Sequence, residues 1–139
     1  MLEIKEIYTE EELEQLMPRE KYVDALYEHL GQFGDTKEAI NNCVEYAFST
    51  AEGKGGFLLA AYYEGKLVGE LIINKTHTFG YIPHNILVYV AVDGTYRGKG
   101  FGRQICEKAI NMCDGDVKLH VEYDNPAKRL YERIGFTNK

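Results

Sequence analysis

Long apolar runs are missing from this sequence, and their absence excludes one class of protein. No run approaches the roughly 20 residues that a helix needs to span a membrane. The N-terminal stretch MLEIKEIYTEEELEQL is acidic and amphipathic, unlike a secretory signal or a transit peptide. Linkers, internal repeats and low-complexity segments are also lacking. We therefore expect one domain, residues 1–139, with no membrane partner.

Cysteine is scarce as well. Cys43, Cys106 and Cys113 are an odd set without a CxxC pair. This spacing argues against a disulfide framework and against a zinc site. Cys106 and Cys113 fall on the apolar face of a predicted helix. We expect reduced core thiols in a cytoplasmic protein that holds no metal.

Basic residues are outnumbered by acidic ones. The chain has 16 Lys and Arg against 22 Asp and Glu, which gives a formal net charge of −6. The imbalance lies in residues 1–50, which hold twelve of the acids and four of the bases. An acidic N-terminal part argues against nucleic acid as a general partner.

The spacing of apolar residues predicts an alternation of helices and strands on one mixed sheet. Thr9 and Glu12 have the spacing of a capping box at the start of the first helix. Glu64-Gly65-Lys66 has the composition of a hairpin turn. The predicted elements are strand 2–7, helices 9–17, 22–33 and 36–51, a hairpin within 56–76, strand 86–92, a helix after Gly102, strand 117–123 and a helix between Asn125 and Gly135.

Three glycines, Gly98, Gly100 and Gly102, stand between a predicted strand and a predicted helix. Such turns commonly hold phosphate, because glycine lets the backbone amides approach an anion closely. Two well-known patterns do not fit. The dinucleotide-binding pattern G-x-G-x-x-G fails because Arg103 stands in the place of the third glycine. The P-loop pattern G-x-x-x-x-G-K-[ST] fails because Gly94 is one residue too close.

Arg97, Gly100 and Gly102 fit a third pattern, R-x-x-G-x-G after a buried strand. It resembles the pyrophosphate-binding loop of the GNAT superfamily of N-acetyltransferases. The later stretch VEYDNPAKRLYERIGF resembles the second motif of that family, in which an Asn precedes a helix that reads A-x-x-L-Y and ends at G-F. The resemblance covers about residues 56–136. The residues of the second motif are Asn125, Ala127, Leu130, Tyr131, Gly135 and Phe136.

This resemblance implies a fold and an activity. The fold is a single α/β (α+β) domain, in which a mixed, mostly antiparallel sheet has a splayed central strand pair and helices on both faces. The activity is transfer of the acetyl group of acetyl-CoA, a co-substrate, to a primary amine of a small molecule or protein by direct attack in a ternary complex. Two alternatives stay open: a catalytically idle acyl-CoA-binding or sensing module, and an enzyme of this fold that uses another acyl group.

The resemblance also implies the contacts of acetyl-CoA. The separating strands are Ile86–Val92 and Val117–Tyr123, and the pantetheine arm pairs with the backbone of the first. The pyrophosphate lies on the main-chain amides of the glycine turn, beside basic side chains. We expect the side chain of Phe101 to serve the core more than the ligand. The implied binding residues are Val90, Ala91, Val92, Arg97, Gly98, Lys99, Gly100, Phe101, Gly102, Arg103, Asn125 and Tyr131.

Two proton transfers accompany attack of an amine on a thioester. Tyr131 matches the family tyrosine that protonates the leaving thiolate, although a buried position in the core would also explain it. The general base is left open among Glu122, which is the first choice, Glu70, His120, Tyr89 and water. For Glu70 the alternative is an outward-facing residue of an alternating strand.

The acceptor is less well defined. The segments REKYVDALYEHLGQFGD and HTFGYIPH, which are rich in Tyr, Phe and acids, correspond to the family's acceptor site and favour a cationic amine. After the G-F pair the sequence ends at Lys139, where family members normally continue into a last strand. We expect an unpaired strand edge, and a homodimer that covers it.

Overall fold

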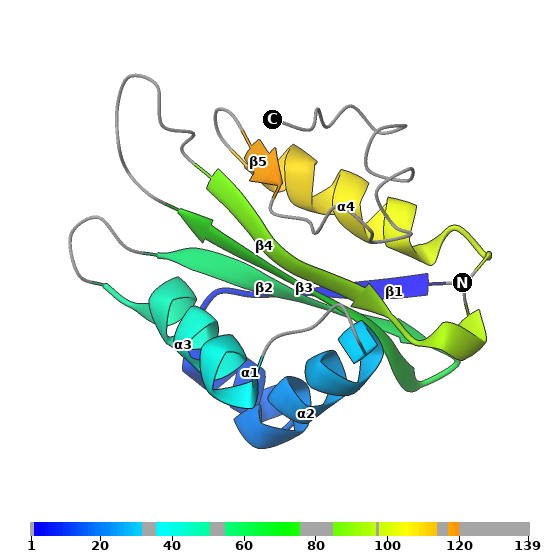
Figure 1. Ribbon diagram of the computed structural model, residues 1–139, viewed down its shortest axis with the longest axis horizontal. Coiled ribbons are helices and arrows are strands. Elements are labelled where there is room, and N and C mark those ends of the chain that lie inside the picture. The colour runs from blue at the N-terminus through cyan, green and yellow to red at the C-terminus, as the bar shows by residue number, and fades with distance from the viewer. Residues whose placement is uncertain are drawn as a thin grey trace.

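The computed structural model describes residues 2–31, 36–50, 55–75, 85–96, 98–113 and 117–119 (Figure 1). None of the helices in these ranges is long and apolar enough to cross a membrane. The elements are, in chain order, β1 (Leu2–Ile7), α1 (Glu10–Leu16), α2 (Arg19–Leu30), α3 (Lys37–Phe48), β2 (Gly56–Tyr63), β3 (Lys66–Lys75), β4 (Asn85–Val92), the 3₁₀ turn η2 (Gly94–Tyr96), α4 (Phe101–Met112) and β5 (Val117–Leu119).

The described strands form one sheet in the order β1-β2-β3-β4-β5. Neighbours from β1 to β4 are antiparallel, and β5 pairs in parallel with β4. Glu64 and Gly65 connect β2 to β3 with positive φ angles of 52° and 81°, the conformation that a two-residue hairpin turn requires. The predicted hairpin and the predicted mixed, mostly antiparallel sheet are therefore confirmed.

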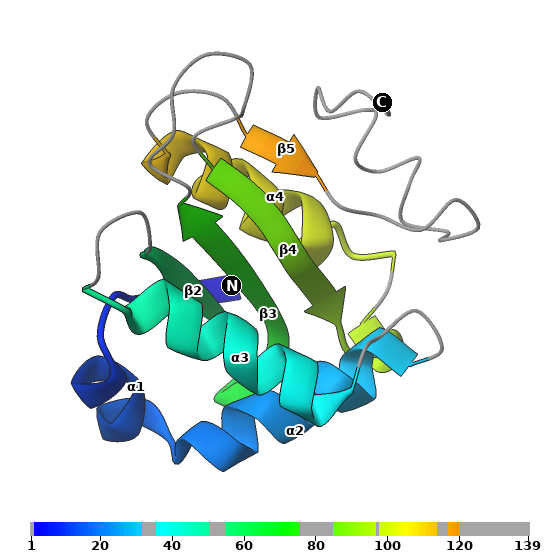
Figure 2. The same ribbon diagram turned by 60° about the vertical axis from the view of Figure 1, so that its left-hand side comes forward.

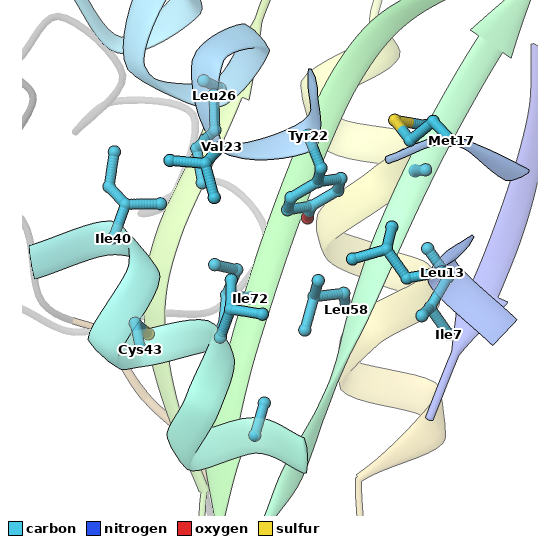
Figure 3. Close-up of a cluster of buried hydrophobic side chains, with 14 of the residues drawn as sticks. Ile7, Leu13, Met17, Tyr22, Val23, Leu26, Ile40, Cys43, Leu58 and Ile72 are labelled. Carbon is cyan, nitrogen blue, oxygen red and sulfur yellow. The ribbon is translucent and has the colours of Figure 1, made fainter. Parts of the chain in front are cut away.

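Helices cover both faces of this sheet, as the resemblance to the family implies. The layer formed by α1, α2 and α3 lies on one face, and α4 lies on the other (Figures 1 and 2). On its own face α4 buries Ile105, Cys106 and Ala109 against the sheet. The buried side chains between the sheet and the first layer include Ile7, Leu13, Tyr22, Leu26, Ile40, Leu58 and Ile72 (Figure 3).

All three cysteines are free thiols, in line with the expectation from their spacing. Cys43 belongs to α3 and Cys106 to α4, and both side chains are buried in the core. Burial raises the pKa of each of these two thiols to about 12. Because the thiolate is the reactive form, Cys43 and Cys106 act as core residues and not as nucleophiles.

Candidate active site

The chain leaves β4 through a turn that Asp93 holds in place. The backbone N–H of Asp93 donates to the carbonyl oxygen of Val68 on β3 at 2.7 Å. The Oδ1 atom of Asp93 accepts the backbone N–H of Thr95 at 3.0 Å, and its carbonyl accepts that of Tyr96 at 2.9 Å. These bonds fix the direction in which the chain runs from the sheet toward α4.

Gly98 and Gly100 shape the segment that enters α4. Their φ angles are +85° and +79°, a region that residues with a Cβ atom rarely adopt. Among the described residues, and apart from the two chain neighbours, a Cβ atom added at either position would meet no heavy atom within 4 Å. Tight packing against the described part of the chain therefore does not explain these glycines. On that side the space is open, as the close approach of a ligand requires.

The N-terminus of α4 is suited to an anion. The backbone N–H groups of Phe101, Gly102 and Arg103 lie in the first turn, where no earlier helical carbonyl can accept them. The first turn carries no acidic side chain. Lys99 is exposed beside it, and Arg103 pairs with Glu107 at 2.8 Å. The helix dipole and these amides together favour a negatively charged group.

Aromatic side chains hold this turn against the β2–β3 hairpin. The ring of Phe101 lies 5.1 Å from that of Tyr63 and 6.2 Å from that of Tyr96, and the two tyrosine rings are 5.7 Å apart. The ammonium group of Lys66 lies 5.5 Å from the centre of the Tyr96 ring. Phe101 is 6% exposed, so its side chain serves the core, and only its backbone N–H is available to a ligand at the turn.

Strand β4 carries a bulge on the side of β3. Ile72 pairs with Tyr89 and Ile73 with Leu87, which leaves Val88 as the extra residue. The parallel pairing with β5 is described only as far as Leu87, opposite Leu119. Beyond the bulge, Val90, Ala91 and Val92 pair with β3, and no described strand pairs with them on the other side. This stretch of backbone is where the resemblance to the family predicts the pantetheine arm.

A cluster of ionisable groups lies on the α2 side of the sheet, next to β4. The Nδ1 atom of His29, in the last turn of α2, is 2.8 Å from the Oε1 atom of Glu70 on β3. Glu70 stands directly opposite Ala91. The Nε2 atom of His29 is 3.8 Å from the Oδ2 atom of Asp93, which also pairs with Lys66 at 3.5 Å. The sequence pointed to Glu70 as a candidate general base, but it did not point to His29.

Comparison with known proteins identifies the family. The sequence matches the acetyltransferase (GNAT) family over residues 3–136, almost the whole chain. The protein belongs to the GNAT family of acetyltransferases. No curated protein sequence matches the chain significantly.

Several solved structures share this GNAT fold. The aminoglycoside acetyltransferase HMB0005, from an uncultured soil metagenomic sample, has 16% identity and a TM-score of 0.68, with 100% of this chain and 93% of that chain covered. The ribosomal-protein-S18-alanine N-acetyltransferase from Escherichia coli has 19% identity and a TM-score of 0.65, with 100% and 79% covered. Arabidopsis thaliana Naa50, in complex with the bisubstrate analogue CoA-Ac-MVNAL, has 20% identity and a TM-score of 0.69, with 99% and 84% covered.

Within this GNAT domain, Glu70 is not the outward-facing residue that strand alternation would allow. It is 0% exposed, and burial raises the pKa of its carboxyl, which the hydrogen bond with His29 only partly opposes. Burial also disfavours the charged imidazole of His29. Contacts with Glu70, and the charges of Asp93 and Glu28, outweigh that effect and raise the pKa of His29 above its ordinary 6.5. The pair therefore retains its protons to higher pH than the separate groups would in water.

This coupling predicts how stability depends on pH. Because the folded protein binds these protons more tightly than the unfolded chain, the free energy of unfolding should fall as pH rises. Glu70 contributes to this fall above pH 4.5, the ordinary pKa of its carboxyl. His29 contributes to it between pH 6.5, the ordinary pKa of its imidazole, and its raised pKa in the folded protein. Urea unfolding across this range should show the fall. Glu70→Gln should flatten it above 6.5, whereas Glu28→Gln, on the exposed side of α2, should retain most of it. Equal slopes in the wild type and Glu70→Gln would contradict the coupling.

Five residues to which the sequence assigns functional roles lie outside the described residues. They are Arg97, His120, Glu122, Asn125 and Tyr131. Their roles therefore stay predictions. Among the residues that are described, no group of three or more His, Cys, Asp and Glu side chains is arranged to hold a metal ion.

Proposed function

We propose that this GNAT protein is an N-acetyltransferase that moves the acetyl group of acetyl-CoA to a primary amine of a small molecule or protein, by direct attack in a ternary complex. The observation that carries the proposal is the open glycine turn between β4 and α4. A pyrophosphate needs backbone amides that it can approach closely, together with a favourable dipole. The turn offers both, at the place where the sequence resembles the family's loop.

In this proposal acetyl-CoA extends from the turn along β4. Its pyrophosphate lies on the amides from Gly98 to Arg103, with Arg97 and Lys99 adding positive charge. Its pantetheine arm pairs with the backbone of Val90–Val92, on the side away from β3. A backbone N–H of the same stretch donates to the thioester carbonyl oxygen, where negative charge develops during attack.

The chemistry needs a proton donor for the thiolate and a proton acceptor for the amine. We propose Tyr131 as the donor, and we propose that Asn125 begins its helix and contacts the ligand. For the proton acceptor, the sequence ranks Glu122 ahead of Glu70, His120, Tyr89 and water. Of these candidate side chains, the structure describes Glu70 and Tyr89.

We propose a cationic amine as the acceptor, and the acidic charge of residues 1–50 supports this. Solved structures of this fold are named for different acceptors, aminoglycosides and a ribosomal-protein alanine, so charge and not fold is the basis for this choice. Cytoplasmic location and a homodimer stay predictions.

A thiol-release assay tests the proposed function. The purified protein is mixed with acetyl-CoA and a panel of polyamines, aminoglycosides, amino acids and short peptides, and products are identified by mass. We expect release of CoA matched by acetylation of at least one cationic amine, at a rate that falls with added salt. Propionyl-CoA and longer acyl-CoAs test for another acyl group. Binding of acetyl-CoA without acetylation of any amine would contradict the proposal and favour a sensing module.

A further inference from the structure

We infer that His29 is the proton acceptor for the attacking amine and that Glu70 positions it. This inference rests on the proposed function, because it assigns one step of the same acetyl transfer. His29 lies in the last turn of α2, and Glu70 lies in the middle of β3. Their hydrogen bond joins the helical layer to the sheet beside β4.

Glu70 has the properties of a positioning residue and cannot itself meet the amine in this conformation. Its side chain has no exposed area. Its Oε1 atom is hydrogen-bonded to His29 Nδ1 at 2.8 Å, and among the described residues its Oε2 atom has no hydrogen-bond partner. A buried carboxylate with an unsatisfied oxygen costs stability, so its presence calls for a functional explanation. Fixing the orientation of an imidazole supplies one.

His29 lies where this cluster reaches the solvent. Its side chain is 11% exposed and that of Asp93 is 20% exposed. When Nδ1 donates to an ionised Glu70, the lone pair of the ring is on Nε2. The 3.8 Å between Nε2 and Asp93 Oδ2 is too long for a hydrogen bond. An atom about 3 Å from both would bridge them, and we infer that the nitrogen of a cationic amine takes this place.

The chemistry follows a general arrangement in which a buried carboxylate holds an imidazole in one tautomer and stabilises its protonated form. The acceptor ammonium gives one proton to Nε2 of His29. The neutral amine then forms a C–N bond to the thioester carbonyl carbon, and the C–S bond breaks. The thiolate takes a proton from Tyr131, which regains one from the amine nitrogen. His29 returns its proton to solvent, so each turnover yields an amide, CoA thiol and one proton.

The surroundings of His29 determine how the reaction should depend on pH. Glu70 contacts the imidazole from β3 and Asp93 faces it from the end of β4, where Lys66 is paired with Asp93. The charge of Glu28, on the exposed side of α2, adds a smaller effect. The pKa of His29 is raised above 6.5, and the C-terminal end of α2 favours the cation as well. Because a base must be unprotonated to act, kcat/KM should rise with pH through this raised pKa.

Four proteins test the inference with the amine that is most active in the thiol-release assay. His29→Gln should lower kcat/KM by about 10²–10⁴-fold and remove the acidic limb of its pH profile. Glu70→Gln keeps the imidazole and should move that limb to lower pH. Glu11→Gln, on the exposed side of α1, should match the wild type in rate and in the position of the limb. Calorimetry should give similar Kd values for acetyl-CoA in all four.

Nitrogen-15 NMR of the wild-type imidazoles provides a readout that does not depend on any variant folding. We expect His29 to carry its proton on Nδ1 in the neutral form and to titrate at the pH of the kinetic limb. A limb that does not coincide with this titration, or wild-type kinetics in His29→Gln, would overturn the inference while leaving the proposed function intact. A fall in kcat/KM in Glu122→Gln without a fall in His29→Gln would overturn it as well. If the wild type acetylates no amine, the proposed function and this inference fail together.

Discussion

Tyr131→Phe is expected to lower kcat by roughly 10²–10⁴-fold and to leave the Kd for acetyl-CoA nearly unchanged. The reason is that the phenol, with an ordinary pKa near ~10, is protonated at neutral pH and can donate to the departing thiolate. Phenylalanine keeps the ring and removes only the hydroxyl group, so packing around the ring is preserved. Steady-state thiol release and calorimetry with acetyl-CoA give the two quantities separately.

Tyr8→Phe is the matched control for this change. Tyr8 is 47% exposed and lies outside the segments assigned to the site, so the loss of its hydroxyl group should leave kcat at the wild-type value. If Tyr131→Phe also turned over at the wild-type rate across the pH range, Tyr131 would be a packing residue. The proton donor would then have to be sought elsewhere.

Gly100→Asp is expected to weaken acetyl-CoA binding by more than about tenfold, because a side chain there occupies the space that we assign to the pyrophosphate. The added carboxylate would also repel the phosphates. The fold should survive, since no heavy atom of the other described residues lies within 4 Å of the new Cβ atom and Asp tolerates the left-handed conformation better than most residues. Calorimetry measures the affinity, and circular dichroism checks the fold.

Two variants separate the causes of this effect. Gly100→Asn has nearly the same shape without the charge, so it should bind acetyl-CoA better than Gly100→Asp and worse than the wild type. Gly65→Asp places the same side chain in the β2–β3 turn, where φ is +81° and the surrounding space is also open. Gly65→Asp should lose a similar amount of stability to Gly100→Asp and should bind acetyl-CoA with wild-type affinity. Unchanged affinity in a folded Gly100→Asp protein would contradict the assignment of the glycine turn.

Features that depend on neighbouring residues could be predicted from the sequence. The capping box of α1 is present as predicted, with the Glu12 amide donating to Thr9 Oγ1 at 3.1 Å and the Thr9 amide donating to Glu12 Oε1 at 3.1 Å. The turn at Glu64 and Gly65 follows from the same kind of local rule. The order of strand, glycine turn and helix around Gly100 was predictable because glycine spacing is read directly from the chain.

The cluster at His29 was not predictable in this way. His29 and Glu70 are 41 positions apart, and only the packing of α2 on the sheet brings them together. One signal for Glu70 was present, because it interrupts the apolar run LVGELII, which is typical of a strand covered on both faces. A carboxylate in such a strand must be buried. His29, by contrast, has no local pattern that distinguishes it from an exposed residue near a helix end.

The bulge at Val88 also depends on pairing between strands. The sequence shows an almost unbroken apolar stretch in β4, with nothing that marks the extra residue. The register against β3 reveals it, since Ile72 and Ile73 pair with residues two apart, Tyr89 and Leu87. The place where β4 changes its pairing is therefore a property of the sheet and not of the strand alone.

Backbone amide NMR of the nitrogen-15-labelled protein, titrated with acetyl-CoA, tests the central claim most directly, because it locates the co-substrate without requiring a known amine. We predict saturable shifts that are largest from Gly98 to Arg103 and along Val90–Val92, with small shifts on the outer face of α3. Absence of binding, or shifts that spare the glycine turn and gather elsewhere, would contradict the claim that this turn and β4 hold acetyl-CoA.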